Sequence, residues 1–180
     1  TVCCGRIDDQ AYICERSLIR DALSVLLEEA DLDRRPLYIP GTPQYQALDW
    51  LVYDDPTNLD FKLVSPDELL ERFVVALLYF SMRGENWVDS FGFLSPSSVC
   101  WWNEYDDVFG VHFGVLCDPM VVEIRFTSNN LQGQLPTELG LLSNLQYLSL
   151  CKFATMSSSE LDTIITLLGS ILYFISSSGL

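Results

Sequence analysis

Pairs of adjacent carboxylates, such as Asp54-Asp55 and Asp106-Asp107, and a single histidine are the side chains in this 180-residue chain considered for acid–base chemistry. Asp54-Asp55 or Asp106-Asp107 could act on a glycan, a reaction that needs two carboxyl groups on opposite sides of the bond. Adjacent acids in turns are more often solvated turn formers. His112 lies in the alternating segment VHFGV, without a nucleophile motif nearby, which favours a structural or surface role. We predict no catalytic residue; an acidic glycan hydrolase with two working carboxylates is the enzymatic alternative.

The usual signatures of a cofactor or metal site are not found in the sequence. There is no glycine-rich phosphate loop, helical metal-ligand pair or dinucleotide fingerprint, so we expect no cofactor. Zinc binding by Cys3, Cys4 and Cys14 is disfavoured, because His112 is the only histidine and no CxxC pair occurs. A local disulfide, palmitoylation and free thiols remain open for these three cysteines.

The charge of the chain argues against nucleic acid as a partner. The formal net charge is −15, and Arg34-Arg35 is the only pair of adjacent basic residues. The electrostatic field of so acidic a chain repels the phosphate backbone of a nucleic acid. The 49% share of hydrophobic residues is typical of a folded chain, so the acidic excess is interpreted as a solvated surface.

Three helices are expected in the first half of the chain. Ser17 can cap a helix to about Ala30, and Thr42 with Pro43 can start a second helix to about Tyr53. The capping box Ser65-Pro66-Asp67-Glu68 starts the third, and Gly84 stands where a left-handed stop is wanted. The third helix is apolar around most of its girth. Because Glu71 and Arg72 lie within it, a buried core helix is favoured over a membrane span.

Aromatic residues gather between positions 85 and 110. An aromatic box for sugars is one interpretation, but core packing is favoured. Strands are expected over 111–117 and 121–126, paired with each other. The aromatic residues concerned are Trp87, Phe91, Phe93, Trp101, Trp102 and Tyr105.

A repeating apolar pattern begins at Val121 and restarts at Leu145, 24 residues later. Ile124 and Phe126 should point inward from a short strand, Asn129 can bond the backbone of the following turn, and Gly133 permits a tight bend. The segment resembles the consensus LxxLxLxxNxLxGxLPxxLxxLxx of plant-type leucine-rich repeat proteins. Cys100-Trp101-Trp102-Asn103 with Gly114-Val115-Leu116-Cys117 resembles the cysteine-flanked cap of such proteins. Segments upstream are similar to the leader of diatom and algal members: GTPQYQAL, WL, ERFV, LLYF and GENW, between residues 41 and 87.

The resemblance implies an α/β fold with four parts along the chain. Residues 1–84 would form a helical leader, 85–120 an aromatic N-terminal cap, and 121–158 one intact and one degenerate repeat of a parallel-strand solenoid. Residues 159–180 would form an apolar tail helix. The resemblance also implies a disulfide between Cys100 and Cys117, which suits an oxidising compartment. An extracellular or membrane-associated location is therefore expected, with a cytoplasmic scaffold as the alternative.

For function, the resemblance implies a non-enzymatic recognition or scaffold module that binds a protein or peptide. A solenoid normally needs about three repeats, so the chain is expected to be a fragment of a longer receptor-like protein. The apolar segment 161–175 is the hint for an alternative, a structural subunit of a membrane-associated assembly. The oligomeric state is left open. The residues predicted to bind the partner are Glu123, Arg125, Thr127, Gln146, Tyr147 and Ser149.

Overall fold

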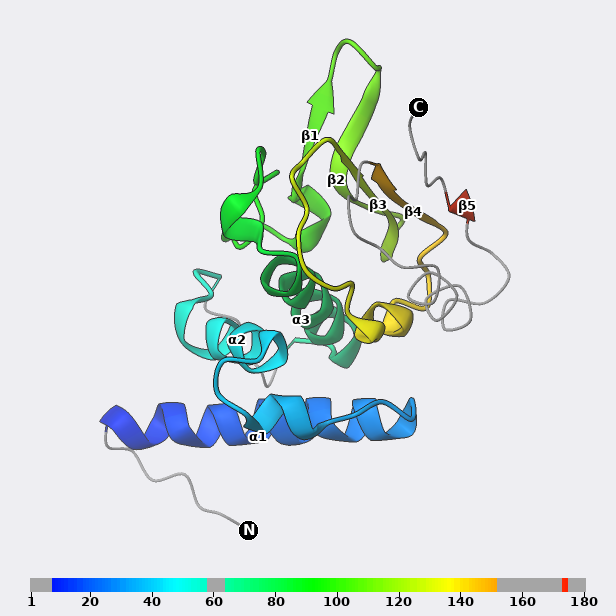
Figure 1. Ribbon diagram of the computed structural model, residues 1–180. Coiled ribbons are helices and arrows are strands. Elements are labelled where there is room, and N and C mark those ends of the chain that lie inside the picture. Colours follow the sequence, from blue (N-terminus) through cyan, green and yellow to red (C-terminus); the bar gives the residue numbers. More distant parts are fainter. Residues whose placement is uncertain (1–7, 58–63, 152–172, 175–180) are drawn as a thin grey trace.

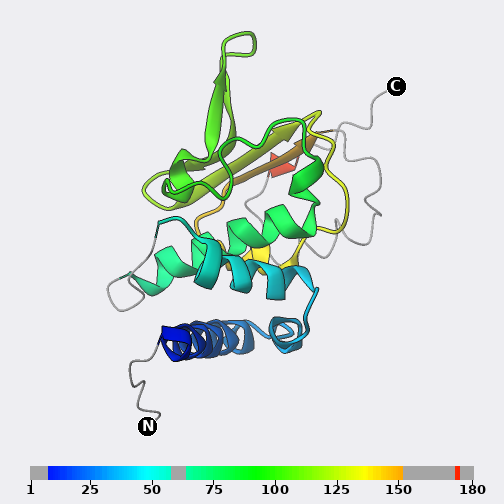
Figure 2. The same cartoon turned by 90° about the vertical axis from the view of Figure 1, so that its left-hand side faces the viewer.

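The computed structural model describes residues 8–57, 64–151 and 173–174. Helices and a sheet lie in successive layers, with α1 (Asp8–Glu29) farthest from the sheet and α3 (Pro66–Ser81) beneath it (Figures 1 and 2). The expectation of a mixed helix and sheet fold is confirmed. One cluster of buried hydrophobic side chains runs from Ile19 on α1 to Leu150 in the sheet.

The first helix begins nine residues before its predicted cap. α1 runs from Asp8, and Ser17 lies inside it instead of at its N-cap. Residues 8–17 contain no glycine or proline, and Asp8 and Asp9 suit the positive end of a helix. A possible cap at Ser17 therefore did not stop the helix from extending further upstream.

The other two helices begin where their caps predicted. Thr42 Oγ1 accepts a hydrogen bond from Tyr45 N at 3.2 Å, and α2 (Pro43–Asp49) continues into the π-helical turn Trp50–Asp54. Ser65 Oγ accepts from Glu68 N at 3.1 Å at the start of α3. Most of α3 is buried, as a core helix requires. Within the described residues, no helix has both the length and the apolar character to cross a membrane.

The end of α3 differs from the prediction. The left-handed residue is Arg83, with φ 52°, and Gly84 starts the short 3-10 turn Gly84–Asn86. Gly84 is needed for space, because a Cβ there would lie 2.1 Å from the ring of Tyr79. The glycine therefore serves close packing and not the left-handed stop.

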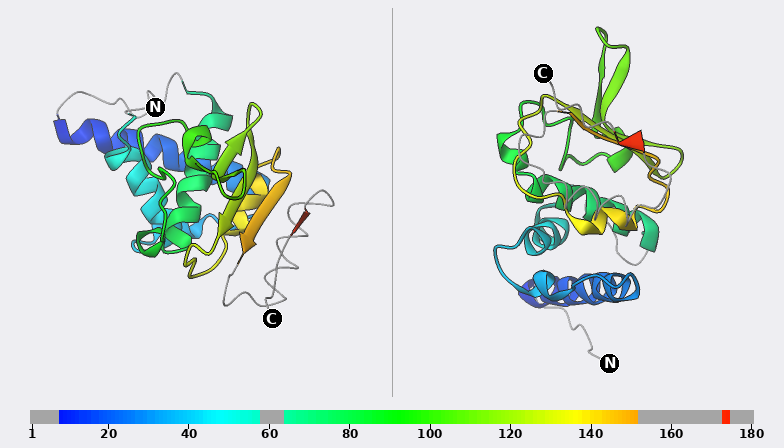
Figure 3. Two further views of the ribbon diagram at one scale, coloured as in Figure 1. Left: turned by 90° about the horizontal axis from the view of Figure 1, so that it is seen from above. Right: turned by 45° about the vertical axis from the view of Figure 1, so that its right-hand side comes forward.

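Among the described residues, the sheet has five strands in the order β1-β2-β3-β4-β5, seen from above in Figure 3. β1 (Asn103–Asp106) and β2 (Val111–Cys117) form a hairpin, and β2 pairs antiparallel with β3 (Val121–Thr127), as predicted. β3 pairs in parallel with β4 (Tyr147–Cys151), through the 3-10 turn Thr137–Leu141. β4 in turn pairs in parallel with β5 (Tyr173–Phe174).

An aromatic cluster fills the space between α3 and the sheet. The ring centroids of Trp87 and Phe126 are 4.9 Å apart, and those of Phe93 and Trp102 are 5.2 Å apart. Of the aromatic residues predicted to pack in the core, Trp87, Phe91, Phe93 and Trp102 are buried, which confirms the prediction for them. Trp101 and Tyr105 are instead exposed.

The predicted repeat places its inward residues in this shared core. Ile124, Phe126 and Leu131 are buried, and Leu135 packs against them partly buried. Gly133 has φ +110° and, as predicted, allows a bend. The prediction for Asn129 is wrong: its side chain bonds the backbone of Asp89, 40 residues earlier, and not its own turn.

The predicted degenerate repeat and tail helix fall mostly outside the described residues. Beyond Cys151 only residues 173 and 174 are described, and they form the strand β5 and not a helix. Tyr and Phe favour strands, and the edge of β4 offers them backbone hydrogen-bonding groups. The tail-helix prediction is therefore wrong at these two positions.

Candidate partner-binding site

Five of the six predicted binding residues lie on the sheet face opposite the core, and the sixth, Gln146, lies just before β4 at the edge of this surface. On β3, Ile124 and Phe126 are buried, whereas Glu123, Arg125 and Thr127 alternate with them and are half-buried. Side chains in a strand point alternately to the two faces, so these three share the outer face. We call the surface formed by the six predicted residues the strand face.

The parallel register joins the two strands of this surface. Glu123 lies opposite Tyr147, and Arg125 lies opposite Ser149. The backbone N–H of Gln146 donates to Val122 O at 2.8 Å and extends the pairing one step before β4. The predicted residues of both strands are therefore brought side by side.

Arg125 is the centre of the strand face. Its guanidinium forms an ion pair with Glu123 and stands over the ring of Tyr147, with its central carbon 4.9 Å from the ring centroid. The side chains of Arg125 and Glu123 are 23% and 22% exposed. A cation over an aromatic ring is stabilised by the ring quadrupole, so Arg125 holds the two strands' side chains in one arrangement.

The remaining predicted residues differ in accessibility. Gln146 is exposed and Thr127 is half-buried. Ser149 is buried, with 4% of its surface exposed, so it offers a partner almost no surface. Its short side chain stands beside the much longer Arg125, its register partner. The accessible part of the strand face therefore consists of the other five residues.

The strand face offers several polar groups and one aromatic ring. It presents one guanidinium, one carboxylate, one phenol, one amide and one accessible hydroxyl. These groups donate and accept hydrogen bonds, and the ring offers apolar contact. The positive charge of Arg125 is balanced by Glu123, so the surface carries no excess of either sign from this pair.

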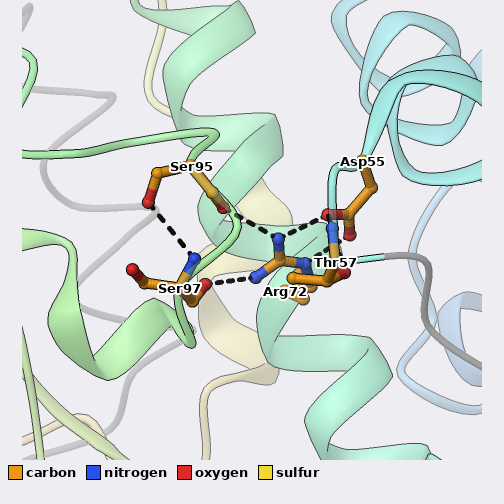
Figure 4. Close-up of polar contacts among 5 residues, drawn as sticks. All are labelled: Asp55, Thr57, Arg72, Ser95 and Ser97. Carbon is orange, nitrogen blue, oxygen red and sulfur yellow. Dashed lines mark hydrogen bonds and ion pairs between the residues drawn. The ribbon is translucent and has the colours of Figure 1, made fainter.

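The carboxylate pairs considered for catalysis have other partners. Asp55 is buried and bonded to Arg72, which also donates to the carbonyl oxygens of Ser95 and Ser97 at 3.1 and 2.9 Å (Figure 4). Asp54 is exposed.

Asp106 shapes the turn of the β1–β2 hairpin. Its Oδ1 accepts from the backbone N–H groups of Val108 and Phe109, at 2.8 and 2.9 Å. This is the turn-forming role expected of an acid at such a position. Asp107 beside it is exposed.

His112 lies on the exposed surface of the hairpin. Its Nδ1 is 3.0 Å from Asn103 Oδ1, and its ring centroid is 5.0 Å from that of Tyr105. Its exposure agrees with the interpretation as a surface histidine. Among the described residues, no group of three or more histidine, cysteine or acidic side chains is arranged to hold a metal ion.

Sequence reasoning missed a buried carboxylate on α3. Glu71 Oε1 accepts from Val121 N at 2.7 Å, at the start of β3. Burial raises the pKa of Glu71, the hydrogen bond from Val121 opposes this, and the charges of Asp67 and Glu68 raise it further. The signal was present in the sequence, because Glu71 and Arg72 are charged residues in an otherwise apolar helix. Their partners, however, come from distant segments.

The disulfide that the resemblance implied is present. Cys100 and Cys117 are bonded, with Cα atoms 5.3 Å apart, and close the base of the β1–β2 hairpin. A disulfide is compatible with an extracellular location. It closes a loop of 17 residues that contains the whole hairpin turn.

Comparisons of the chain with models of known families, with the sequences of curated proteins and with solved structures find no match.

Proposed function

We propose that the chain is a non-enzymatic recognition or scaffold module of the leucine-rich repeat type. Its partner would be a protein or peptide, bound on the strand face of β3 and β4. One observation supports this most directly: Arg125 links Glu123 on its own strand to Tyr147 on the neighbouring parallel strand. Side chains held together in this way need little further ordering when a partner binds.

The sequence of elements from β3 to β4 supports the repeat type. A strand, a turn with buried Asn129, a short 3-10 helix and a second parallel strand follow one another within Val121–Cys151. The inward aliphatic residues of both strands, among them Ile124 and Leu148, share one core. Stacked strands of this kind present their outward side chains to a ligand.

Weak binding is expected from this surface alone. A stable interface buries about 800 Å² on each partner, and two short strands offer much less. The hairpin disulfide is compatible with the proposed extracellular or membrane-associated location, and a cytoplasmic scaffold is the alternative. The hint for a structural membrane subunit, segment 161–175, lies almost wholly outside the described residues.

Peptide selection tests the strand face. A random peptide library displayed on phage would be panned on the immobilised chain, and each selected peptide measured against Arg125→Ala and Tyr147→Ala. Arg35→Ala is the matched control, because Arg35 also pairs with an acid two residues earlier, Asp33, but lies on the helical side. We expect the selection to yield peptides that bind both strand-face variants about tenfold more weakly and the control normally.

A selection in which no peptide is weakened by both Arg125→Ala and Tyr147→Ala would contradict the proposed site. The non-enzymatic part is tested separately with a panel of glycans. We expect no hydrolysis. If a glycan is hydrolysed and the hydrolysis is lost on replacing Asp106-Asp107 or Asp54-Asp55, the chain is a two-carboxylate glycan hydrolase and the proposal of a non-enzymatic module is wrong.

A further inference from the structure

The β1–β2 hairpin extends beyond the rest of the molecule and carries two apolar side chains at its tip. Figures 1 and 2 show the hairpin pointing away from the helices, with its turn at the far end. Val108 and Phe109 lie in this turn, and 87% and 67% of their surfaces are exposed. Single exposed apolar residues are common on protein surfaces, but two adjacent ones at the end of a projecting hairpin form a compact patch.

The turn holds these two side chains in place. The carboxylate of Asp106 accepts hydrogen bonds from the backbone N–H groups of both Val108 and Phe109. Gly110 closes the turn with φ +67°, and its N–H donates to Asp106 O at 2.8 Å. The tip is therefore a built turn whose apolar side chains face outward in a fixed arrangement.

The tip is also supported from the core of the protein. The ring of Phe109 meets that of Phe113 edge-on, with centroids 6.2 Å apart, and Phe113 contacts the buried Phe91 at 6.5 Å. At the base, Asn103 Nδ2 donates to the carbonyl oxygens of Cys100 and Val115. The disulfide of Cys100 closes the same end. Little conformational freedom remains to be lost on binding, which favours affinity.

The charge around the tip selects the kind of partner. Asp107 is exposed in the turn itself, and Glu104 is exposed farther down β1, opposite Phe113; no lysine or arginine occurs between Arg83 and Arg125. Lys and Arg side chains on a partner would complement this acidic surface. A second copy of the chain is disfavoured, because each copy has a formal net charge of −15. An anionic membrane surface is repelled for the same reason.

We propose that the hairpin tip, Val108 and Phe109, is a docking site for a protein that has an apolar pocket rimmed by Lys and Arg. The two side chains enter the pocket, the carboxylate of Asp107 in the turn meets the basic rim, and that of Glu104 meets basic groups of the partner farther along β1. The hairpin binds independently of the strand face, so the two surfaces can fail separately.

Two displayed peptide libraries test this docking site. Both have a randomised apolar centre; one is flanked by Lys and Arg, and the other by Asp and Glu. We expect the full chain to select binders from the basic-flanked library. Val108→Ser/Phe109→Ser should weaken them about thirtyfold, as for loss of central anchor residues. Val88→Ser is the control, since Val88 is 69% exposed on a different loop.

A charge variant tests the rim. Glu104→Gln/Asp107→Asn leaves the Asp106 turn bonds intact, and we expect about fivefold weaker binding at low salt, with a smaller effect at high salt. Thermal unfolding should be unchanged in all these variants, because the replaced side chains are exposed. A strand-face variant, Arg125→Ala, should bind the same peptides normally.

Several outcomes would overturn the proposal. They are the absence of binders, equal selection from the acidic-flanked library, and binders that tolerate Val108→Ser/Phe109→Ser. Tip-dependent binding to vesicles of phosphatidylcholine with phosphatidylserine would assign the tip to a membrane instead. Tip-dependent self-association in gel filtration would assign it to a second copy of the chain.

Discussion

Arg72 and Asp55 form a bidentate ion pair in the interior of the protein. Arg72 Nε donates to Asp55 Oδ2 at 2.5 Å, and Nη2 donates to Oδ1 at 2.6 Å. The guanidinium also contacts the rings of Trp50 and Trp102, with its central carbon 5.2 and 5.0 Å from their centroids. With its bonds to two loop carbonyls, Arg72 joins α3 to the segment after α2 and to the loop before β1 (Figure 4).

Loss of Arg72 should destabilise the fold strongly. Arg72→Met leaves the carboxylate of Asp55 buried without its partner, and we expect a loss of about 3–5 kcal/mol in the free energy of unfolding, measured in urea. Adding Asp55→Leu should recover part of this loss, because the unpaired charge is removed. Arg35→Met, which breaks the exposed pair with Asp33, should have no measurable effect. Strictly additive effects of Arg72→Met and Asp55→Leu would argue against a coupled pair.

Glu71 should make the protein less stable as the pH rises. Because burial raises its pKa in the folded state, the folded protein keeps the proton at pH values where the unfolded chain has lost it. The contribution of Glu71 to the free energy of unfolding is therefore complete at pH values below 4.5, the ordinary pKa of a glutamate. It declines as the pH rises through the pKa of Glu71 in the folded protein. Urea unfolding of wild type and Glu71→Gln over a pH series measures the effect as a difference between the two proteins.

Glu71→Gln should remove the pH-dependent loss and keep an oxygen that can accept from Val121 N. Glu104→Gln, at an exposed position, is the control and should leave the pH profile unchanged. Parallel stability curves for wild type and Glu71→Gln across this range would contradict the prediction.

Gly133 should tolerate no side chain. A Cβ there would lie 2.2 Å from the carbonyl oxygen of Ser81 at the end of α3, and its φ of +110° is unfavourable for other residues. Gly41 has a similar positive φ of +88° with nothing within 4 Å of a Cβ, so it isolates the backbone effect. We expect losses of about 1–2 kcal/mol for Gly41→Ala and about 2–5 kcal/mol for Gly133→Ala, measured by chemical unfolding. Equal losses would mean that the contact with Ser81 is easily relieved.

The Cys100–Cys117 disulfide should contribute to stability by restricting the unfolded chain. A closed loop of this size is worth about 3 kcal/mol in the loop-entropy estimate. Cys100→Ser/Cys117→Ser should lower the midpoint of thermal unfolding, and the reducing agent that lowers the wild-type midpoint should have less effect on the variant. A wild-type midpoint that does not respond to reduction would contradict a structural role for the bond.

Local chemistry explains why parts of the fold were predictable. The caps at Thr42 and Ser65 bond backbone groups three residues away, so the sequence around each cap contains both partners. The alternation of β3 likewise specified its buried side, with Ile124 and Phe126 inward. The start of α1 was missed because a suitable cap residue at Ser17 does not end a helix that can continue upstream.

Long-range partners were decided only in the tertiary structure. Arg72 bonds residues 17, 23 and 25 positions away, and Asn129 bonds Asp89 at a separation of 40. Gly84 is required because the ring of Tyr79 leaves no space for a Cβ, and Arg83 takes the left-handed conformation. A sequence pattern indicates that such a residue is buried or turns the chain, but not which group it meets.

For the candidate binding surfaces too, some features were predictable from the sequence and others were set by tertiary packing. Alternation in the sequence was enough to put Glu123, Arg125 and Thr127 on one face, because the side chains of a strand must alternate. The parallel register that seats Arg125 over Tyr147 and buries Ser149 follows from packing between distant segments. The turn at Val108 and Phe109 is made by local bonds to Asp106, but its exposure depends on how the rest of the chain packs. Periodicity is a local property of the chain, whereas register and exposure depend on every element packed around it.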